Sequence, residues 1–352
     1  MSIDTTIERA IRFLLYCQHP DGWWADFQLA AGPSNVWVTA YIGLVLARQE
    51  NTKAREAAAR AWHWLSERES LGGWGYNVLT PCDADSTLWA LQLAEAVGAV
   101  KDISTKSEPI KSEPTKSQSV ENGYRFLKQH VRPGGGVTTY ASEREIRAFV
   151  EAPASVSFRG WCEPQVCVTA AAGGIDELTA GACEFLRESQ SLDGRWHSYW
   201  WCEDEYATTL AVVALQKQNN PEDTERIESA INWAIARLDA DGWVSSFLYR
   251  YGSPFATAWI IYLLSISTEP QTVKDAIEKS WRWLQAQQKP NGSWSGSASL
   301  RVPPPDLQDP QKYEGWKLGR KIEGGISLDQ NGLFTTATVL EALSQLKNKQ
   351  LG

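Results

Sequence analysis

The chain has 352 residues, with 34 Lys and Arg against 42 Asp and Glu and a formal net charge of −8. This mild acidity, without a block of basic residues, argues against nucleic-acid binding. No apolar run reaches the roughly 20 residues that a membrane-spanning helix needs, and contact with a membrane surface stays open. The N-terminal segment, with Asp4, Glu8 and Arg9 on a helical pattern, does not resemble a signal peptide. The six cysteines include no Cys-x-x-Cys pair, so we expect a cytoplasmic protein with reduced thiols.

A short pattern recurs along the chain and uses many of the 18 tryptophans. It consists of an aromatic residue and Leu, a Gln after three further residues, and then Gly and Trp. Complete copies span residues 13–24, 185–196 and 283–294, and a copy at 64–74 has Glu in place of Gln. Degraded copies follow the same order at residues 126–136 and 233–243. Each copy ends an amphipathic helical pattern at a glycine, which is typical of a helix C-terminus.

A second, more apolar segment of helix length follows each copy. These segments begin near residues 34, 83, 163, 204, 253 and 331. The first helix of each pair has one polar face and is expected outside, and the second is apolar nearly all round and is expected inside. The alternation predicts an all-α fold, an (α/α)6 barrel of six outer and six inner helices, in a single domain over residues 1–352.

Three stretches interrupt this alternation. Residues from about 101 to 119 are rich in charge, Ser and Pro, which predicts a mobile insert. Residues 133–161 and 295–330 are long loops, and each joins an outer helix to the next inner helix. Both loops must therefore lie at the end of the barrel where inner helices begin. Because long loops in a compact domain are usually functional, we expect them to form a lid over a cavity.

The inner helices align on a threonine near their starts, and the positions two residues before and after it share one helix face. Large aromatic or small residues recur on this face, and one helix carries an acid there, Asp85. We expect this face, together with Trp161 at the end of the first loop, to line a substrate cavity. The residues predicted on the face are Trp37, Tyr41, Asp85, Trp89, Cys167, Tyr206, Phe255, Trp259 and Phe334.

A carboxyl group in an aromatic wall is held protonated by desolvation. Such a group is suited to protonating an alkene, and ring faces stabilise the resulting carbocation without trapping it. The pattern therefore favours Asp85 as a general acid in a reaction that needs neither metal nor other cofactor. Two simpler interpretations stay open: Asp83 or Asp85 caps the inner helix, and the aromatic face packs between the helix layers.

The repeats resemble the QW motifs of squalene-hopene and oxidosqualene cyclases over nearly the whole chain. The run from Asp83 to Thr87 resembles the Asp-x-Asp-Asp-Thr motif of class II terpene cyclases, with Ser86 in place of the last Asp. The resemblance implies that Asp85 is the general acid and that Asp83 tunes it. A single barrel is similar to the monodomain cyclases that act on a prenylated aromatic acid, which implies a lipophilic isoprenoid substrate. Arg301, in the second loop, is then the candidate for holding a polar head group.

Other functions stay open at this stage. A cyclase of a prenyl diphosphate would use Mg²⁺ and the basic residues Lys317, Arg320 and Lys321. A zinc-dependent prenyltransferase-like enzyme shares the barrel, but Ala207 stands where a His ligand is expected, and only Cys82, Cys162 and Cys202 keep a thiolate site open. A polysaccharide-active enzyme would pair Asp85 with Glu203 or Asp204. A non-catalytic α/α toroid would carry a Cys-Gly-Glu-Gln run, which is absent. The oligomeric state is left open.

Overall fold

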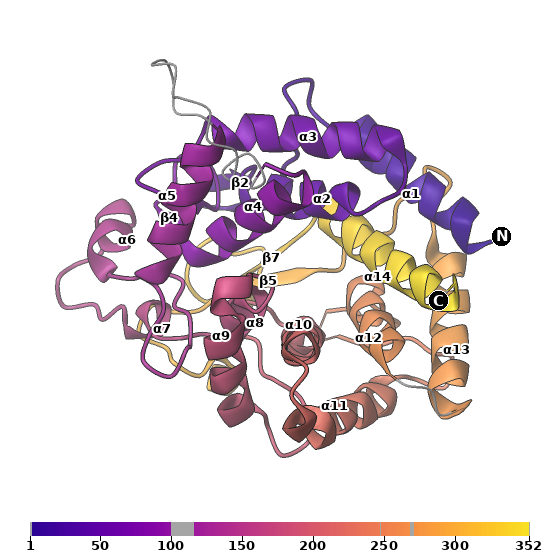
Figure 1. Ribbon diagram of the computed structural model, residues 1–352. Helices are drawn as coiled ribbons and strands as arrows, with labels where there is room; N and C mark the ends of the chain where they lie inside the picture. The colour runs from indigo at the N-terminus through magenta and orange to yellow at the C-terminus, as the bar shows by residue number, and fades with distance from the viewer. Residues whose placement is uncertain (1, 100–115, 247, 268–270, 352) are drawn as a thin grey trace.

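The structure is a computed structural model that describes residues 2–99, 116–246, 248–267 and 271–351 (Figure 1). Its outer helices are α1 (Ile3–Cys17), α3 (Thr52–Ser66), α5 (Lys116–Lys128), α9 (Asp176–Ser189), α11 (Thr224–Arg237) and α13 (Gln271–Gln287). Its inner helices are α2 (Trp37–Ala47), α4 (Ala84–Ala96), α8 (Val166–Ala172), α10 (Asp204–Gln218), α12 (Pro254–Ile266) and α14 (Leu333–Leu351). The two sets form concentric rings in Figure 1, so the predicted barrel is confirmed.

Two predicted boundaries need comment. Most of the insert expected at about 101–119 lies outside the described residues, and its last residues, from Lys116 onward, already belong to α5. Of the inner-helix starts, Asp83 and Ser253 are N-caps, and each accepts a backbone N–H three residues later. The starts expected near residues 34, 163 and 204 are not capped in this way, since the N-cap residues of α2, α8 and α10 are Val36, Gln165 and Glu203, without a side-chain cap bond. Among the described residues, none of the helices has the length and apolar character needed to cross a bilayer.

The repeated pattern ties each outer helix to the turn that follows it. Four copies of the pattern contain both its Leu and its final Trp. In each of them the indole N–H of the Trp donates to the backbone carbonyl of the Leu at 2.7–2.8 Å. Gln18 donates to the carbonyl of Gly22 in its own turn and to that of Ala57 on the next outer helix. Gln288 donates to Gly292 and to Thr6, which joins the last repeat to the first. These tryptophans are therefore structural and explain part of the unusual tryptophan content.

A threonine fixes each inner helix to the same turn. Its hydroxyl oxygen accepts a backbone N–H from the turn at 2.8–3.2 Å, which confirms the alignment of the inner helices on this residue. The bonded pairs are Trp24 and Thr39, Trp74 and Thr87, Val137 and Thr169, Trp196 and Thr208, Val244 and Thr257, and Trp294 and Thr336. Each inner helix is thus fixed near its start to the turn that follows the preceding outer helix.

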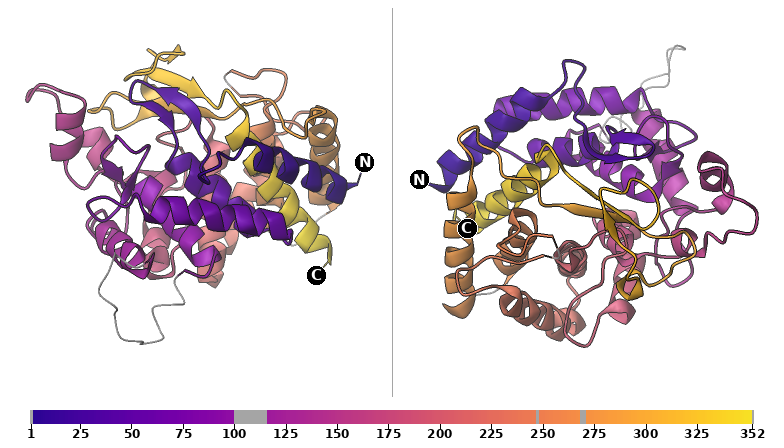
Figure 2. Two further views of the ribbon diagram at one scale, coloured as in Figure 1. Left: turned by 90° about the horizontal axis from the view of Figure 1, so that it is seen from above. Right: turned by 180° about the vertical axis from the view of Figure 1, so that it is seen from behind.

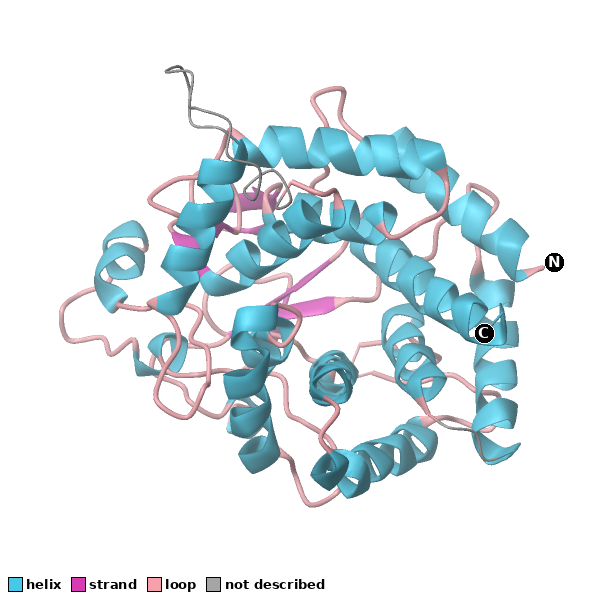
Figure 3. Ribbon diagram, in the orientation of Figure 1, coloured by secondary structure: helices cyan, strands magenta, loops and turns pink. Residues whose placement is uncertain are grey.

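The outer-to-inner connections contain strands that the sequence patterns did not predict (Figure 3). A hairpin consists of β1 (Asp26–Leu29) and β2 (Gly32–Ser34), and β3 (Trp74–Gly75) pairs with β4 (Cys82–Asp83). The long connection before α14 folds into a sheet in the order β5-β7-β6, made of Ser299–Val302, Gly325–Leu328 and Lys317–Leu318. The connection before α8 carries two short helices, α6 (Glu143–Phe149) and α7 (Arg159–Cys162). The hairpin and the three-stranded sheet gather at one end of the barrel (Figure 2, left).

Candidate active site

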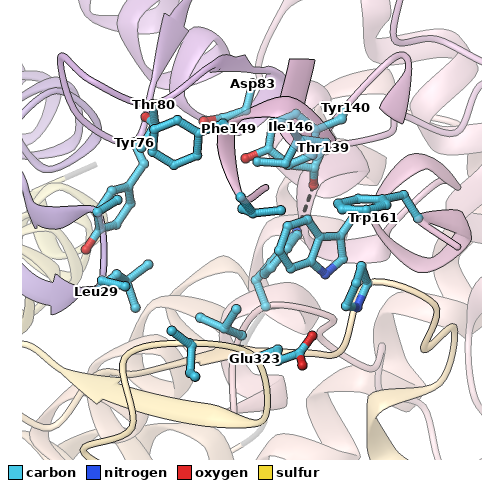
Figure 4. A pocket seen from close by; sticks show the side chains of 18 of the residues that line it. Leu29, Tyr76, Thr80, Asp83, Thr139, Tyr140, Ile146, Phe149, Trp161 and Glu323 are labelled. Atoms are coloured by element: carbon cyan, nitrogen blue, oxygen red, sulfur yellow. Dashed lines mark hydrogen bonds between the residues drawn. The ribbon is translucent and has the colours of Figure 1, made fainter. Parts of the chain in front are cut away.

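A cavity of about 470 Å³ lies at the end of the barrel where the inner helices begin. Both long connections, before α8 and before α14, contribute residues to its wall. Figure 4 shows Asp83 and Tyr140 on one side of the cavity and Glu323 on the opposite side. The lining is mostly apolar and aromatic, and its rings belong to Trp37, Tyr76, Tyr140, Phe149, Phe158, Trp161, Trp200 and Trp201. The space is suited to an apolar ligand.

Asp83 caps helix α4 at the cavity wall. Its Oδ1 accepts the backbone N–H of Ser86 at 2.7 Å, and its Oδ2 accepts the Ser86 hydroxyl at 2.9 Å. Burial raises the pKa of Asp83 to about 7, against the lowering effect of these hydrogen bonds. Ser86, which departs from the acidic motif, therefore acts as a double donor that orients Asp83.

Asp85 lies two residues after this cap, and its side chain lines the cavity. Burial, helped by the negative charge of Asp83, raises the pKa of Asp85 to about 8, even though the indole groups of Trp89 and Trp37 act to lower it. With a pKa above neutrality, the carboxyl carries its proton at pH 7. Since Asp83 occupies the N-cap position, helix capping does not account for Asp85, and a protonated acid faces the apolar cavity.

Trp161 lines the cavity as expected from its place at the end of the first long loop, but the aromatic wall residues around it, Tyr140 and Trp200, were missed by the sequence patterns. Trp161 packs on Trp200 with ring centroids 5.6 Å apart, and Tyr140 lies 6.2 Å from Trp161. The Trp200 indole donates to the hydroxyl of Thr139 at 2.7 Å, which fixes the ring in the cavity wall. All of these residues stand in outer-to-inner connections, and that shared position at one end of the barrel is the signal that could have identified them.

The barrel axis beneath the cavity is filled by rings. Tyr41 stacks on Phe334 with centroids 4.1 Å apart and meets Trp89 edge-on at 5.0 Å. Tyr206 meets Trp259 edge-on at 5.2 Å, and Phe255 lies 6.0 Å from Phe334. The residues that the helix-face pattern placed on the wall but that do not line the cavity are Tyr41, Trp89, Cys167, Tyr206, Phe255, Trp259 and Phe334.

Two tryptophans belong both to this ring cluster and to the cavity. Trp37 and Trp201 line the cavity, and their centroids lie 4.9 and 5.3 Å from that of Phe334. They therefore form the floor that separates the cavity from the axis. The predicted aromatic face does point inward, but rings of this size fill the narrow barrel, and the open space is displaced toward the connections.

Arg301 lies on β5 with only 4% of its surface exposed, and it lines the cavity. Its Nε donates to the carbonyl of Tyr199 at 2.9 Å, and a second guanidinium nitrogen donates to the carbonyl of Ser198. These bonds hold the connection before α10 against the sheet, so part of the guanidinium is engaged in structure. Lys321 also lines the cavity, whereas Lys317 and Arg320 do not.

The residues of the other candidate functions are dispersed. Residues 2–99, 116–246, 248–267 and 271–351 contain no group of three or more His, Cys, Asp or Glu side chains that could hold a metal ion. Cys82, Cys162 and Cys202 are free thiols in three different connections. Glu203 and Asp204, the partners considered for a carboxylate pair, do not line the cavity.

Comparisons with known proteins agree with this geometry. Residues 171–300 match the squalene-hopene cyclase C-terminal domain family. The curated squalene-hopene cyclase of Zymomonas mobilis is 22% identical over 308 residues, which are 74% of this chain and 44% of the relative. A lanosterol synthase of Aspergillus fumigatus is 23% identical over 314 residues, 74% of this chain and 40% of the relative. The chain thus spans less than half the length of the curated relatives that it matches.

Solved structures of similar length match over the whole barrel. The type II terpene cyclase MstE from Scytonema, in complex with its product merosterolic acid A, superposes with a TM-score of 0.91 and 37% identity, covering 99% of this chain and 97% of that chain. MstE in complex with its substrate geranylgeranyl dihydroxybenzoate gives the same score and identity, with 99% and 98% covered. A protein from Actinoplanes superposes with a TM-score of 0.86, 36% identity, and 98% and 100% covered. The chain therefore belongs to the type II terpene cyclase family.

Proposed function

We propose that this protein cyclises a polyprenyl chain attached to an aromatic acid, with Asp85 as the general acid. The observation that carries the proposal is the Asp85 carboxyl, with its pKa raised to about 8, on the wall of a mostly apolar, aromatic cavity. Further support comes from the substrate and product bound by MstE, which matches this chain from end to end.

In the proposed reaction, Asp85 transfers its proton to the terminal double bond of the chain. An O–H bond breaks, a C–H bond forms, and a carbocation appears on the substrate while Asp85 becomes a carboxylate. Neighbouring double bonds then attack the cation in turn and close rings. The last cation loses a proton, which passes to solvent, so that an alkene is regenerated, and Asp85 takes up a proton from solvent before the next turnover. Substrate and product are isomers, so the reaction balances without an oxidant, a reductant or a cofactor. The rings of Trp37, Trp161 and Trp201 stabilise the cations and exclude water.

The head group is assigned to the side of the cavity opposite Asp83, where Glu323 lies (Figure 4). Lys321 and Arg301 are the basic residues of the lining, and we assign them to the carboxylate of the aromatic acid. A prenyl diphosphate is the second candidate substrate because Lys321 would serve a diphosphate equally well. A diphosphate carries more negative charge than a carboxylate, so its site would need more than the two basic side chains present on the wall. The aromatic acid is therefore the better fit.

Contact with a membrane surface is part of the same proposal. The large apolar side chains that are exposed all stand near the ends of outer helices or in outer-to-inner connections: Tyr16, Leu71, Val78, Leu79, Phe149, Val150, Leu192, Tyr251, Leu318 and Ile322. They therefore lie at the cavity end of the described barrel. Phe149, Val150 and Ile322 also line the cavity, so this apolar surface is continuous with the entrance for a lipophilic substrate.

Co-sedimentation with vesicles tests this contact. Vesicles of phosphatidylcholine and phosphatidylserine should bind the wild type, and Ile322→Glu together with Leu318→Glu should weaken binding because both place charge in the apolar surface. Thr52→Glu, at the start of α3 and hence at the opposite end of the barrel, is the matched control and should bind like the wild type. Equal binding by all three proteins would contradict the proposal that the cavity end of the barrel contacts the membrane.

Product analysis tests the activity itself. The purified protein is incubated with prenylated dihydroxybenzoates and with prenyl diphosphates of matching chain lengths, each with and without Mg²⁺. We expect a cyclised isomer of the prenylated acid that forms without Mg²⁺. Cyclisation of the diphosphate alone, in a Mg²⁺-dependent manner, would overturn the substrate assignment in favour of the second candidate.

A further inference from the structure

Two buried indole N–H groups near Asp85 have no hydrogen-bond acceptor. They belong to Trp37 and Trp89, whose side chains are almost completely buried. A buried donor that is left unpaired destabilises the fold, and nearly all such groups in native proteins find a partner. Two exceptions beside the proposed general acid therefore need a physical explanation.

Both indoles approach Asp85 from fixed positions on inner helices. Trp89 lies one turn after Asp85 on α4, and helical side chains lean back over the preceding turn, so its ring covers the Asp85 position. Trp37 opens α2, the inner helix beside α4, and lines the same cavity as Asp85. The two N–H groups come near enough to lower the pKa of Asp85 but do not reach hydrogen-bonding geometry.

Packing holds both rings in this arrangement. The Trp89 ring meets Tyr41 edge-on with centroids 5.0 Å apart. The Trp37 ring stacks on Phe334 at 4.9 Å and contacts Trp201 at 5.7 Å. Because the surrounding rings restrict rotation, the two donors are oriented before the reaction begins, which is the condition for electrostatic stabilisation at low reorganisation cost.

We propose that the indole N–H groups of Trp37 and Trp89 form the binding site for the Asp85 carboxylate that appears when the proton leaves. In the resting state Asp85 is protonated and both donors are unpaired. As the O–H bond breaks, negative charge develops on the carboxylate beside the two N–H groups, and the N–H···O bonds strengthen. An interaction that forms only as this charge develops lowers the barrier and does not stabilise the resting enzyme. Toward Asp85 the two tryptophans are positioning residues, and the inference rests on the proposed role of Asp85.

Tryptophan-to-phenylalanine variants test the proposal because they keep a ring and remove the N–H. Trp89→Phe is the cleaner variant, since Trp89 does not line the cavity. We expect the alkaline limb of its kcat profile to move up by about one pH unit and the plateau to fall about tenfold, with little change in KM. Trp37→Phe should shift the limb in the same direction. Trp259→Phe is the matched control, because its buried indole is also unpaired and lies in the same ring cluster but does not act on Asp85.

The direction of the shift separates this role from a merely structural one. Water admitted by a packing defect would lower the pKa of Asp85, whereas loss of a donor raises it. An upward shift in both variants, with Trp259→Phe unchanged, supports the proposal. The proposal would be overturned if the alkaline limb of the pH profile stayed in place or moved to lower pH in Trp89→Phe and Trp37→Phe.

A second measurement does not depend on turnover. The carboxylic acid C=O band of Asp85 is identified by infrared difference spectroscopy against Asp85→Asn and titrated without substrate. The band should persist to higher pH in Trp89→Phe and Trp37→Phe than in the wild type, and identical midpoints would contradict the inference. If the band shifts but no polyprenyl substrate is cyclised, the proposed function fails while the hydrogen-bonding role stands. Melting curves of each variant exclude misfolding, and either tryptophan alone suffices for the test.

Discussion

The indole N–H of Trp161 donates to the backbone carbonyl of Pro303, 3.0 Å away, and this bond joins the two long connections that cover the cavity. The backbone N–H groups of Gly160 and Trp161 both donate to the carbonyl of Pro305, at 2.8 and 3.3 Å, so the junction has three adjacent bonds. The cover is therefore one continuous structure made from segments more than 140 residues apart.

Trp161→Phe removes the side-chain bond of this junction and part of the contact with Trp200. The cover should loosen, and water should reach the carbocations more often. We expect total substrate conversion to fall several-fold and the share of hydroxylated products to rise, as measured by mass spectrometry. Trp243→Phe, in the connection after α11 and outside the cavity lining, should keep the wild-type product ratio.

Replacing the acid separates chemistry from folding. Asp85→Asn keeps the shape of the side chain and removes the transferable proton, so cyclisation should fall below detection while the melting temperature is maintained or rises. Asp83→Ala should instead destabilise the protein by about 1 kcal/mol, because α4 loses its N-cap. Full activity in Asp85→Asn would end the proposed mechanism.

Activity should depend on pH through the acid form of Asp85. Since burial raises the pKa of Asp85 to about 8, kcat should be level near neutrality and fall about tenfold for each pH unit well above that value. Initial rates at saturating substrate between pH 6 and 10 measure this limb. A rate that increases throughout this range would indicate that the carboxylate form is active and would contradict the assignment.

Stability should fall as the pH rises from 5 to 9. Burial raises the pKa of Asp26 to about 6, of Asp83 to about 7 and of Glu203 to about 8, all above the value of about 4 in an unfolded chain. The folded state then binds protons more tightly, so this stabilisation is complete below about pH 4 and is lost as the pH passes through the raised values. Melting temperatures across this range check the trend. Glu203→Gln should reduce the decline, whereas Glu222→Gln, an exposed residue, should not.

The head-group assignment predicts a selective loss. Lys321→Ala should raise KM several-fold for the prenylated aromatic acid and leave KM for its methyl ester nearly unchanged, because only the free acid presents a carboxylate. Arg320→Ala is the matched control, because Arg320 is a basic residue next to Lys321 that does not line the cavity. Equal effects of Lys321→Ala on acid and ester would place the head group elsewhere.

The helices of the barrel can be predicted from the sequence because the signals that mark them are local. The apolar period of each helix, the glycine that ends each outer helix and the threonine near each inner-helix start identify the twelve barrel helices, and Asp85 is visible as the one acid in a repeated position. The strands are short and paired over long distances, as between Ser299 and Leu328, so no local period marks them. The same period shows that Phe334 and Trp259 point inward, but whether inward rings enclose a space or fill it depends on the barrel diameter, which periodicity does not specify.

The threonine bonds that fix the inner helices have a consequence for engineering. All six anchor points sit where a connection meets its inner helix, and the rings on the axis support the helices from within. Because each bond joins the turn after an outer helix to the start of the next inner helix, we expect that the segment between the two bonded residues can be exchanged among cyclases while the scaffold is kept. Chimeras that carry a foreign segment in place of residues 304–322 should retain the parental melting temperature while accepting a different range of isoprenoids.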